Sequence, residues 1–421
     1  MSDPQKKRPR KFNPEPFGYH EEIDLTIDSL TNLGQGVGRV KIRESEADWV
    51  VFVPFTVPGE KIRARIFRNS ANFSEADLVE IIEPSPERVE PQCPLFGDCG
   101  GCQYQHLDYA TQLRWKQKHV AEVLRKLANV ETEIDPVIPS PVEYGYRSKI
   151  TPHFQRPRDG VIDAIGFLRF GRRQMLIDVP QCPIASGPIN EKIGPLRAET
   201  HRNALSYKKG ATLLLRDSAE APGLVCTDST DVCEEVVGDL RFQFHAGEFF
   251  QNNPHILPAF TGHVAEEASA GGAKNLVDAY CGSGLFCLTA ANRFERAAGI
   301  EISEPAIDWA QRNAKLNDIE NVRFIQGDAA DIFASVPDFN PAETAVIIDP
   351  PRKGSSTEFL AQLVEFRPAR IVYVSCNPST QARDLNELKD HFRITRVQPF
   401  DLFPQTRHLE CVITLETIQQ G

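Results

Sequence analysis

The stretch that decides the fold is Asn275-Leu276-Val277-Asp278-Ala279-Tyr280, which runs directly into Cys281-Gly282-Ser283-Gly284-Leu285-Phe286. Its first part is a short apolar run, as in a buried strand, and the glycines after it are typical of a tight turn. Glycine has no Cβ atom, so such a turn lets a ligand approach the backbone closely. We therefore expect a strand, a ligand-binding turn and a helix here.

Downstream of this turn, apolar strands alternate with helical segments. Strands are expected at 275–280, 296–302, 322–326, 344–349, 370–375, 393–398 and 409–416, and helices at 285–294, 304–316, 357–366 and 380–390. This alternation predicts an α/β domain over residues 241–421, with a doubly wound, mostly parallel sheet. No helix separates the last two strands, so they should pair antiparallel.

The N-terminal part has a different pattern. Residues 1–18 are basic and rich in proline, which predicts a disordered arm. Residues 19–84 contain strand-like runs at 23–27, 49–53 and 61–66, with glycine or proline turns at 34–38 and 57–60. Short strands with such turns are typical of a small OB-like β-barrel.

Residues 85–240 form a basic central α+β region. From Pro141 to Arg216 there are 13 Lys or Arg against 6 Asp or Glu, although the whole chain carries a net charge of −11. This region would attract phosphate, or would simply be a solvated basic face; charge alone does not separate the two interpretations. A helix is expected over 107–128, with a core face of Leu113, Val120, Val123, Leu124 and Leu127.

Composition excludes some classes of protein. No run of about 18 uncharged apolar residues occurs, so we expect no membrane span. The N-terminus lacks the apolar stretch of a signal peptide, so we expect a cytoplasmic protein, and we take it to be a monomer. Its ten cysteines should then be thiols, metal ligands or catalytic groups rather than disulfides.

Acidic residues follow the next two strands. Glu301 ends the second strand, 17 residues after Gly284, where folds of this type hold ribose hydroxyls. Asp328 ends the third strand, where a side chain could hold an adenine. The alternative is an α/β core that binds no nucleotide and merely carries these acids on its surface. The match to a ligand site at three strand ends argues against it. S-adenosylmethionine (SAM) is the ligand that we expect, and NAD is the nearest rival; NAD is disfavoured because Gly282-x-Gly284 lacks a third glycine at the right spacing.

Three more motifs lie at the expected ligand edge of the sheet. Asp349-Pro350-Pro351-Arg352 follows one strand, Ser375-Cys376-Asn377-Pro378 follows the next, and His408-Leu409-Glu410 opens the last. The two prolines would hold Asp349 rigidly. A cysteine at a strand end is more often an inert buried thiol, but the neighbouring Asp349 favours a functional Cys376. Phe249-Phe250-Gln251-Asn252-Asn253 adds aromatic surface and amides that can bond a base edge or a carboxylate.

A thiol suits methylation of uracil. The C5 carbon of uracil is a poor nucleophile until a thiolate adds at C6 and turns the ring into an enolate. A base must then remove the C5 proton so that the thiolate can leave. Cys376 is our candidate nucleophile and Glu410 our candidate base. A free thiol has a pKa of roughly 8.5, so the site must help to ionise it.

With these motifs in this order, the sequence resembles the RNA uracil-5 methyltransferase family, from about residue 20 to its C-terminus. The N-terminal segment resembles a TRAM domain, an RNA-binding barrel. The resemblance implies a class I SAM-dependent methyltransferase fold, with Cys376 as nucleophile and Glu410 as base. It implies SAM contacts at Gln251, Tyr280, Gly282, Gly284, Glu301, Asp328 and Asp349. Leu285 departs from the family, in which many members carry Asn there.

Four cysteines form a separate group. Cys93, Cys99 and Cys102 have the spacing C-x5-C-x2-C, and Cys182 lies in Val179-Pro180-Gln181-Cys182-Pro183. Spacing alone allows zinc as readily as iron–sulfur. The rRNA-type members of the family carry a 4Fe–4S cluster on such a pattern, so the resemblance favours a structural 4Fe–4S cluster.

Four functions remain open. The first is methylation of a uridine in 23S rRNA, which requires the base to be flipped out at a cost of a few kcal/mol. The same chemistry on tRNA is the alternative. RNA cytosine-5 methylation also uses a thiol, but the motifs at Asp349 and Glu410 argue against it. A non-catalytic iron–sulfur RNA-binding protein is disfavoured by the intact set Asp349, Cys376 and Glu410.

Overall fold

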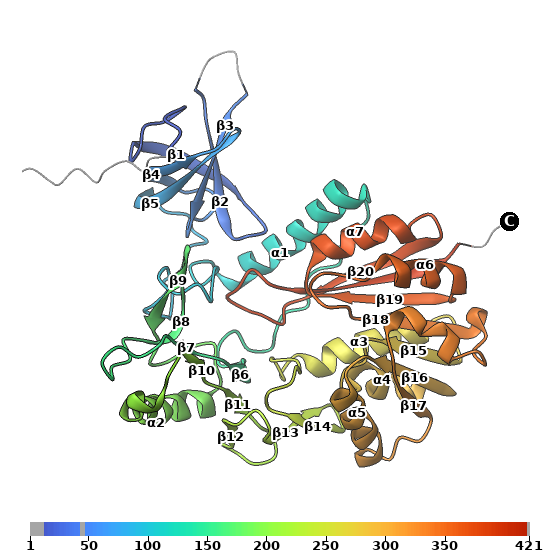
Figure 1. The fold of residues 1–421 in the computed structure, drawn as a ribbon. Coiled ribbons are helices and arrows are strands. Elements are labelled where there is room, and N and C mark those ends of the chain that lie inside the picture. Colours follow the sequence, from blue (N-terminus) through green and yellow to red (C-terminus); the bar gives the residue numbers. More distant parts are fainter. Residues whose placement is uncertain (1–11, 43–46, 419–421) are drawn as a thin grey trace, which may run out of the picture. The chain divides into compact units, whose positions relative to one another are not determined.

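The structure is a computed structural model that describes residues 12–42 and 47–418 (Figure 1). These residues form two compact units. The first extends to Trp115 and includes Gln405–Arg407; the second comprises Lys116–Pro404 and the residues from His408 onward. The expected arm falls mostly outside the described residues. Its described end carries Phe12 and Phe17, which are buried in the core of the barrel that follows.

The first unit contains a closed five-stranded barrel, as expected for a TRAM domain. Its strands follow the order β1-β2-β3-β5-β4 around the barrel. Their bounds are β1 Glu22–Leu30, β2 Gln35–Val40, β3 Trp49–Pro54, β4 Lys61–Asn69 and β5 Phe73–Glu83. Inward-facing residues alternate along β4, where Ile62, Ala64 and Ile66 are fully buried. In the same unit, the Gln112 side chain holds Gln405 by hydrogen bonds to its backbone N–H and side chain, both 3.0 Å.

One expectation for the barrel is wrong. We expected residues 34–38 to be a turn, but β2 begins at Gln35. The reason lies in how closely the strands approach. A Cβ atom at Gly36 would lie 1.9 Å from the Thr56 Oγ1, and one at Gly38 would lie 2.4 Å from the Leu25 Cδ1. These glycines therefore serve close packing within the barrel, whereas Gly34, with φ of +80°, makes the turn.

The second unit is built on a seven-stranded sheet of order β17-β16-β15-β18-β19-β21-β20. All neighbours are parallel except β21, which pairs antiparallel with β19 and β20 as expected. The strands are β15 Asn275–Ala279, β16 Arg296–Glu301, β17 Val322–Gln326, β18 Thr344–Ile348, β19 Arg370–Ser375, β20 Phe392–Phe400 and β21 Glu410–Thr417. The sequence prediction of these strands is confirmed to within two residues at each end.

Helices cover both faces of this sheet (Figure 1). Leu276 and Ile347 pack on the face of α3 and α4, while Val277 and Ile348 pack on the face of α6 and α7. Both faces of the central strands are buried, so β18 and β19 are mainly apolar runs. The helices are α3 Leu257–Ser269, α4 Leu285–Ala290, α5 Glu304–Leu316, α6 Thr357–Phe366 and α7 Pro378–Leu388.

The residues between the barrel and this sheet form smaller elements. Helix α1 spans Tyr109–Val123 and continues as a π-helical turn over Leu124–Ala128. That turn shifts the helical face, so Leu124 is buried, but Leu127, an expected core residue, is 52% exposed. The remaining elements are β6 Lys149–Ile150, β7 His153–Phe154, β8 Ile165–Arg169, β9 Arg172–Asp178, α2 Gly187–Arg202, β10 Ala211–Thr212, β11 Leu215–Asp217, β12 Val225–Cys226, β13 Val232–Val237 and β14 Leu240–His245. Among the described residues, no helix is long and apolar enough to span a membrane.

Candidate functional site

The sheet gathers the expected site residues at one edge. Tyr280, Glu301, Asp328, Asp349 and Cys376 all lie at or just beyond the carboxyl ends of the five parallel strands, and Glu410 opens antiparallel β21. The strand order changes direction between β15 and β18, because the chain adds β16 and β17 on one side and β18 and β19 on the other. Ligands of open α/β sheets bind at such a point.

The glycine turn after β15 is shaped for close approach. Gly282 has a φ of +53°, and a Cβ atom built on it would meet nothing within 4 Å, so the space beside it is open. Gly284 has a φ of +92°, but its Cβ would lie 3.0 Å from Leu288 and 3.2 Å from Phe324. Gly282 thus faces free space, whereas Gly284 is needed for packing.

Glu301 is held rigidly beside this turn. Its two carboxylate oxygens accept hydrogen bonds from the backbone N–H groups of Gly282, at 3.2 Å, and Ser303, at 3.0 Å. Each oxygen keeps a free lone pair, so the carboxylate can still accept hydrogen bonds from two hydroxyl groups. This is the chemistry that a ribose requires.

Two unfavourable features lie next to this turn: the backbone of Tyr280 is strained, and the Asp278 side chain has an unsatisfied oxygen. Tyr280 adopts a left-handed φ of +66°, a conformation that costs about 1–3 kcal/mol for a non-glycine residue and clusters at functional sites. Asp278 is fully buried, and its Oδ1 atom has no partner among the described residues. Burial raises the pKa of Asp278 well above its usual range, and the nearby Asp349 and Glu301 raise it further. The sequence reasoning assigned no role to Asp278.

Cys376 and Glu410 lie together across neighbouring strands. Ser375 pairs with Cys411 in the ladder between β19 and β21, so the next residues along the two strands are Cys376 and Glu410. Glu410 is only 3% exposed, whereas Cys376 is half-buried. The structure therefore brings the expected nucleophile and the expected base to the same point, although 34 residues separate them in the chain.

The charges at this point disfavour ionisation in the unliganded protein. Burial, followed by the charges of Glu410 and Asp349, raises the pKa of Cys376 to about 11, although Arg352 opposes the rise through its charge and a hydrogen bond. Burial also raises the pKa of Asp349 to about 7, and that of Glu410 well above its usual range. Arg352 is thus the cation of this cluster, a role that the sequence reasoning missed although its motif includes the residue.

Amides fix the strand ends that carry these groups. The Gln381 side chain, fully buried on α7, donates to the carbonyls of Tyr373 at 2.9 Å and Cys411 at 3.1 Å, so it bridges β19 and β21. Asn377 donates to the Arg352 carbonyl at 3.3 Å. The Cys376 loop and the Arg352 loop are therefore tied to one another.

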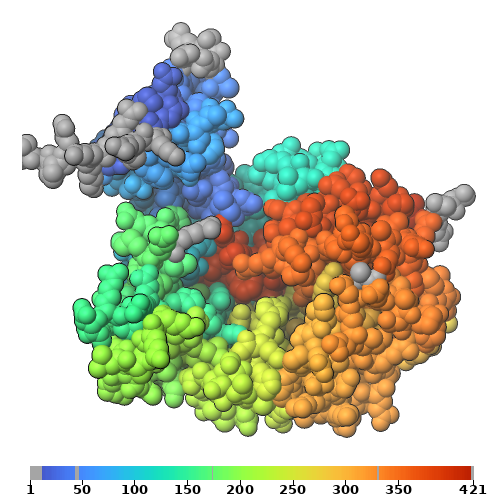
Figure 2. Space-filling view, viewed as in Figure 1, coloured from blue at the N-terminus to red at the C-terminus, as the bar shows by residue number. Residues whose placement is uncertain are grey.

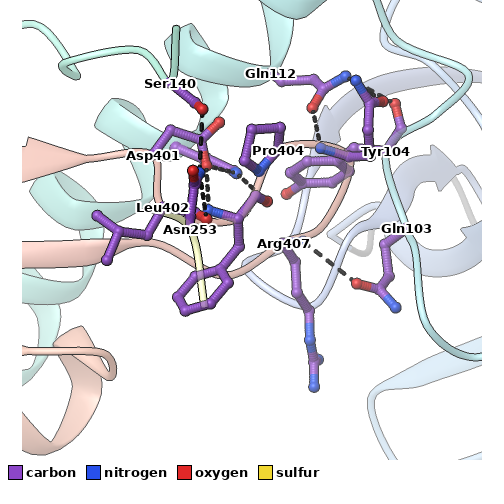
Figure 3. A network of polar contacts seen from close by, with 12 residues as sticks. Gln103, Tyr104, Gln112, Ser140, Asn253, Asp401, Leu402, Pro404 and Arg407 are labelled. Atoms are coloured by element: carbon purple, nitrogen blue, oxygen red, sulfur yellow. Dashed lines mark hydrogen bonds and ion pairs between the residues drawn. The ribbon is translucent and has the colours of Figure 1, made fainter. Parts of the chain in front are cut away.

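Residues 401–404, which follow β20, are anchored within the second unit (Figure 3). Lys116, fully buried, donates to Asp401 at 2.6 Å. Asn253 donates through its side-chain amide to Ser140 Oγ at 3.1 Å and to the Leu402 carbonyl at 3.0 Å. The Tyr146 hydroxyl donates to the Pro404 carbonyl at 3.0 Å. Asn253 follows Gln251 by two residues. The amide-rich motif therefore also supports residues 401–404, which precede Glu410 in the chain.

The four cysteines expected to bind a cluster are partly buried. Cys93, Cys99 and Cys102 belong to the first unit and Cys182 to the second. Among the described residues, no group of three or more His, Cys, Asp or Glu side chains is arranged to hold a metal ion. The chain has no disulfide among its ten cysteines, all of which are described.

Comparison with known proteins agrees with this geometry. The tRNA (uracil-5-)-methyltransferase family profile matches residues 229–418, and the TRAM domain profile matches residues 20–79. A tRNA (uracil(54)-C(5))-methyltransferase of Schizosaccharomyces pombe is 41% identical over 96% of this chain and 80% of its own length. The enzyme of the same name from Saccharomyces cerevisiae is 33% identical over 95% of this chain and 74% of its own length.

A solved structure resembles the chain over most of its length. It is the Pyrococcus abyssi tRNA (uracil-54, C5)-methyltransferase in complex with S-adenosyl-L-homocysteine. The TM-score is 0.71 at 26% identity, and the match covers 93% of this chain and all of that one. The expected fold, a class I methyltransferase sheet with a TRAM barrel, is thereby confirmed.

Proposed function

Because this chain belongs to the RNA uracil-5 methyltransferase family, we propose that it transfers a methyl group from SAM to C5 of a uridine in tRNA, at the position equivalent to uridine 54. The geometry that carries the proposal is the meeting of Cys376, Glu410 and Asp349 at one edge of the sheet. The names of the related proteins favour tRNA. The rRNA substrate that we first expected finds no support among them.

The residues at the edge fit SAM. Open space beside Gly282, the unpartnered Oδ1 of Asp278 and the free lone pairs of Glu301 suit a ligand with an amino group and a ribose. Gln251, Tyr280, Asp328 and Asp349 would complete the contacts. Bound SAM would supply the methyl group and, through its sulfonium, a positive charge.

Cys376 and Glu410 divide the chemistry. The Cys376 thiolate would add to C6 of the uracil, which makes C5 nucleophilic enough to take the methyl group. Glu410, as carboxylate, would then accept the C5 proton, and the C6–sulfur bond would break to release 5-methyluridine and the thiolate. Burial raises the pKa of both groups, which disfavours their charged forms. The chemistry therefore requires them to lose protons when substrates bind, and the Arg352 charge favours that change.

The deciding experiment compares RNA substrates. Purified protein is incubated with methyl-labelled SAM and tRNA transcripts that carry uridine or cytidine at position 54, and with large-subunit rRNA in parallel. We expect 5-methyluridine, identified by nucleoside mass spectrometry, only in tRNA with uridine 54. Methylation of rRNA alone would restore the rRNA hypothesis, 5-methylcytidine would show a cytosine methyltransferase, and no transfer would leave a non-catalytic RNA-binding protein.

A 4Fe–4S cluster on Cys93, Cys99, Cys102 and Cys182 is a separate proposal. It rests on their spacing and on the partial exposure of all four thiols. No catalytic step depends on it. Anaerobic purification followed by iron, sulfide and zinc analysis tests it. About four irons per chain would support the cluster; zinc alone, or no metal, would reject it.

A further inference from the structure

The loop Ala246–Phe250 joins β14 to Gln251 and has no regular secondary structure. It nevertheless contains Phe249 and leads directly into Gln251, which are two of the candidate ligand residues. Phe249 is 75% exposed, and Gln251 is only 5% exposed. An irregular loop that carries site residues needs external support if it is to hold them in one geometry.

Two cations supply that support. Arg216 donates to the carbonyls of Ala246 at 3.3 Å, Glu248 at 2.8 Å and Phe250 at 3.3 Å. Lys149 donates to the carbonyls of Gly247 at 3.1 Å and Glu248 at 3.0 Å. Beyond the loop, the Ser148 N–H donates to the Asn252 carbonyl at 2.8 Å. The backbone is therefore held on both sides of Gln251.

The placement of these two cations is electrostatically unfavourable, because they lie next to one another and are removed from water. Arg216 and Lys149 are directly opposite partners in the β11–β6 ladder, where like charges repel. Arg216 is 1% exposed, and its hydrogen bonds end on carbonyls. Burial and, to a smaller extent, the Arg216 charge lower the pKa of Lys149 to about 8. Natural proteins place like charges together and bury them mainly where function requires it.

Aromatic packing completes the support. The Arg216 guanidinium lies 4.5 Å from the centre of the Phe244 ring, and Phe250 stacks on that ring at 4.4 Å with an interplanar angle of 12°. Arg216 thus supports Phe250 directly at its carbonyl and indirectly through the Phe244 ring. A lysine at position 216 could not reproduce the planar contact or the forked hydrogen bonds.

We propose that Lys149 and Arg216 are positioning residues: they clamp the Ala246–Phe250 loop and so orient Gln251 at the methylation site. This inference rests on the proposed function for the role of Gln251, but the clamp itself can be tested separately. It also means that two of the basic residues of the central region act inside the protein rather than on RNA.

The first test measures the clamp without activity. Chymotrypsin cleaves after exposed aromatic residues in mobile segments, and Phe249 is such a residue once the loop is released. In Lys149→Met, cleavage after Phe249 should be at least about tenfold faster than in the wild type, because two charge-assisted hydrogen bonds are lost. Lys315→Met, which changes an exposed lysine on α5, is the matched control. Wild-type cleavage rates in Lys149→Met would overturn the clamp.

The second test asks whether the clamp acts through Gln251. Single-turnover methylation is measured for Lys149→Met, Gln251→Ala and the double variant. We expect Lys149→Met to slow methylation about tenfold alone and not at all in the Gln251→Ala background, because the clamp then has nothing to orient. Additive losses would overturn the positioning role. Lys149→Arg should restore most of the rate. If the wild type itself transfers no methyl group, the proposed function fails, and the cleavage test still decides the clamp.

Discussion

Cys376 and Glu410 each lie one residue beyond the same paired position, Ser375–Cys411, on two antiparallel strands. The Gln381 side chain donates to the carbonyls of Tyr373 and Cys411 and so bridges the two strands close to these residues. A base that must remove a proton from the ring to which the thiol is bonded has to lie this close. The ladder therefore sets the spacing of the two groups.

Replacing Glu410 with Gln should trap the covalent intermediate. The amide keeps the shape of the side chain but cannot accept the C5 proton, so the C6–sulfur bond cannot break. We expect a slow-migrating protein–RNA band on a denaturing gel after incubation with SAM and tRNA. The double variant Cys376→Ala/Glu410→Gln is the control and should give no band. If Glu410→Gln alone gives none, Glu410 is not the base.

Alkylation of Cys376 should depend steeply on pH. Burial, Glu410 and Asp349 raise its pKa to about 11, so the thiol is neutral at pH 7 and the thiolate fraction grows about tenfold per pH unit below that value. The iodoacetamide rate at Cys376 in the free protein, followed by peptide mass spectrometry, should therefore rise about tenfold per unit from pH 7 to 9.5. A plateau near pH 8 would mean that the free site already stabilises the thiolate. In Arg352→Met the rate should fall, because the cation that opposes the rise is gone.

The two glycines of the turn should fail in different ways when changed to alanine. Both have a positive φ, which costs about 1–2 kcal/mol for alanine. At Gly282 the new methyl group meets only open space, so the protein should fold but lose SAM affinity by about tenfold or more. At Gly284 the methyl group presses on Leu288 and Phe324, so stability should fall further. Calorimetry and thermal unfolding separate the two effects; equal losses of SAM affinity at equal stability would contradict the assignment.

Lys116→Met should destabilise the second unit. It leaves Asp401 buried and charged without its partner, which costs about 3–5 kcal/mol. For a unit of this size the midpoint of thermal unfolding should fall by roughly 6–20 °C. Adding Asp401→Asn removes the stranded charge, and the amide oxygen can still accept from the Phe403 N–H. The double variant should therefore be more stable than Lys116→Met, and a lower midpoint would show that the pair is not the cause.

Local patterns predicted the sheet well because its central strands are buried on both faces. The run from Ala345 to Ile348 has no polar interruption, which is typical of a buried parallel strand. The local sequence pattern gave wrong predictions where contacts with distant residues or an irregular helical turn determine the structure. Gly36 and Gly38 are typical of a turn in the sequence. In the structure they lie in a strand, where Thr56 and Leu25 leave no room for a Cβ atom. Leu127 has helical spacing, but a π-helical turn rotates it into solvent.

By itself, the sequence determined the positions of the strands along the chain, the glycine turn, and the motifs that contain Asp349, Cys376 and Glu410. Strand and turn propensities act over neighbouring residues, so they can be recognised locally. Only the tertiary structure decided that Cys376 faces Glu410, that Arg352 is the cation beside them, and that Lys149 and Arg216 grip the loop before Gln251. These relationships join residues far apart in the chain, and they depend on ladder register and burial. Local patterns do not encode either quantity.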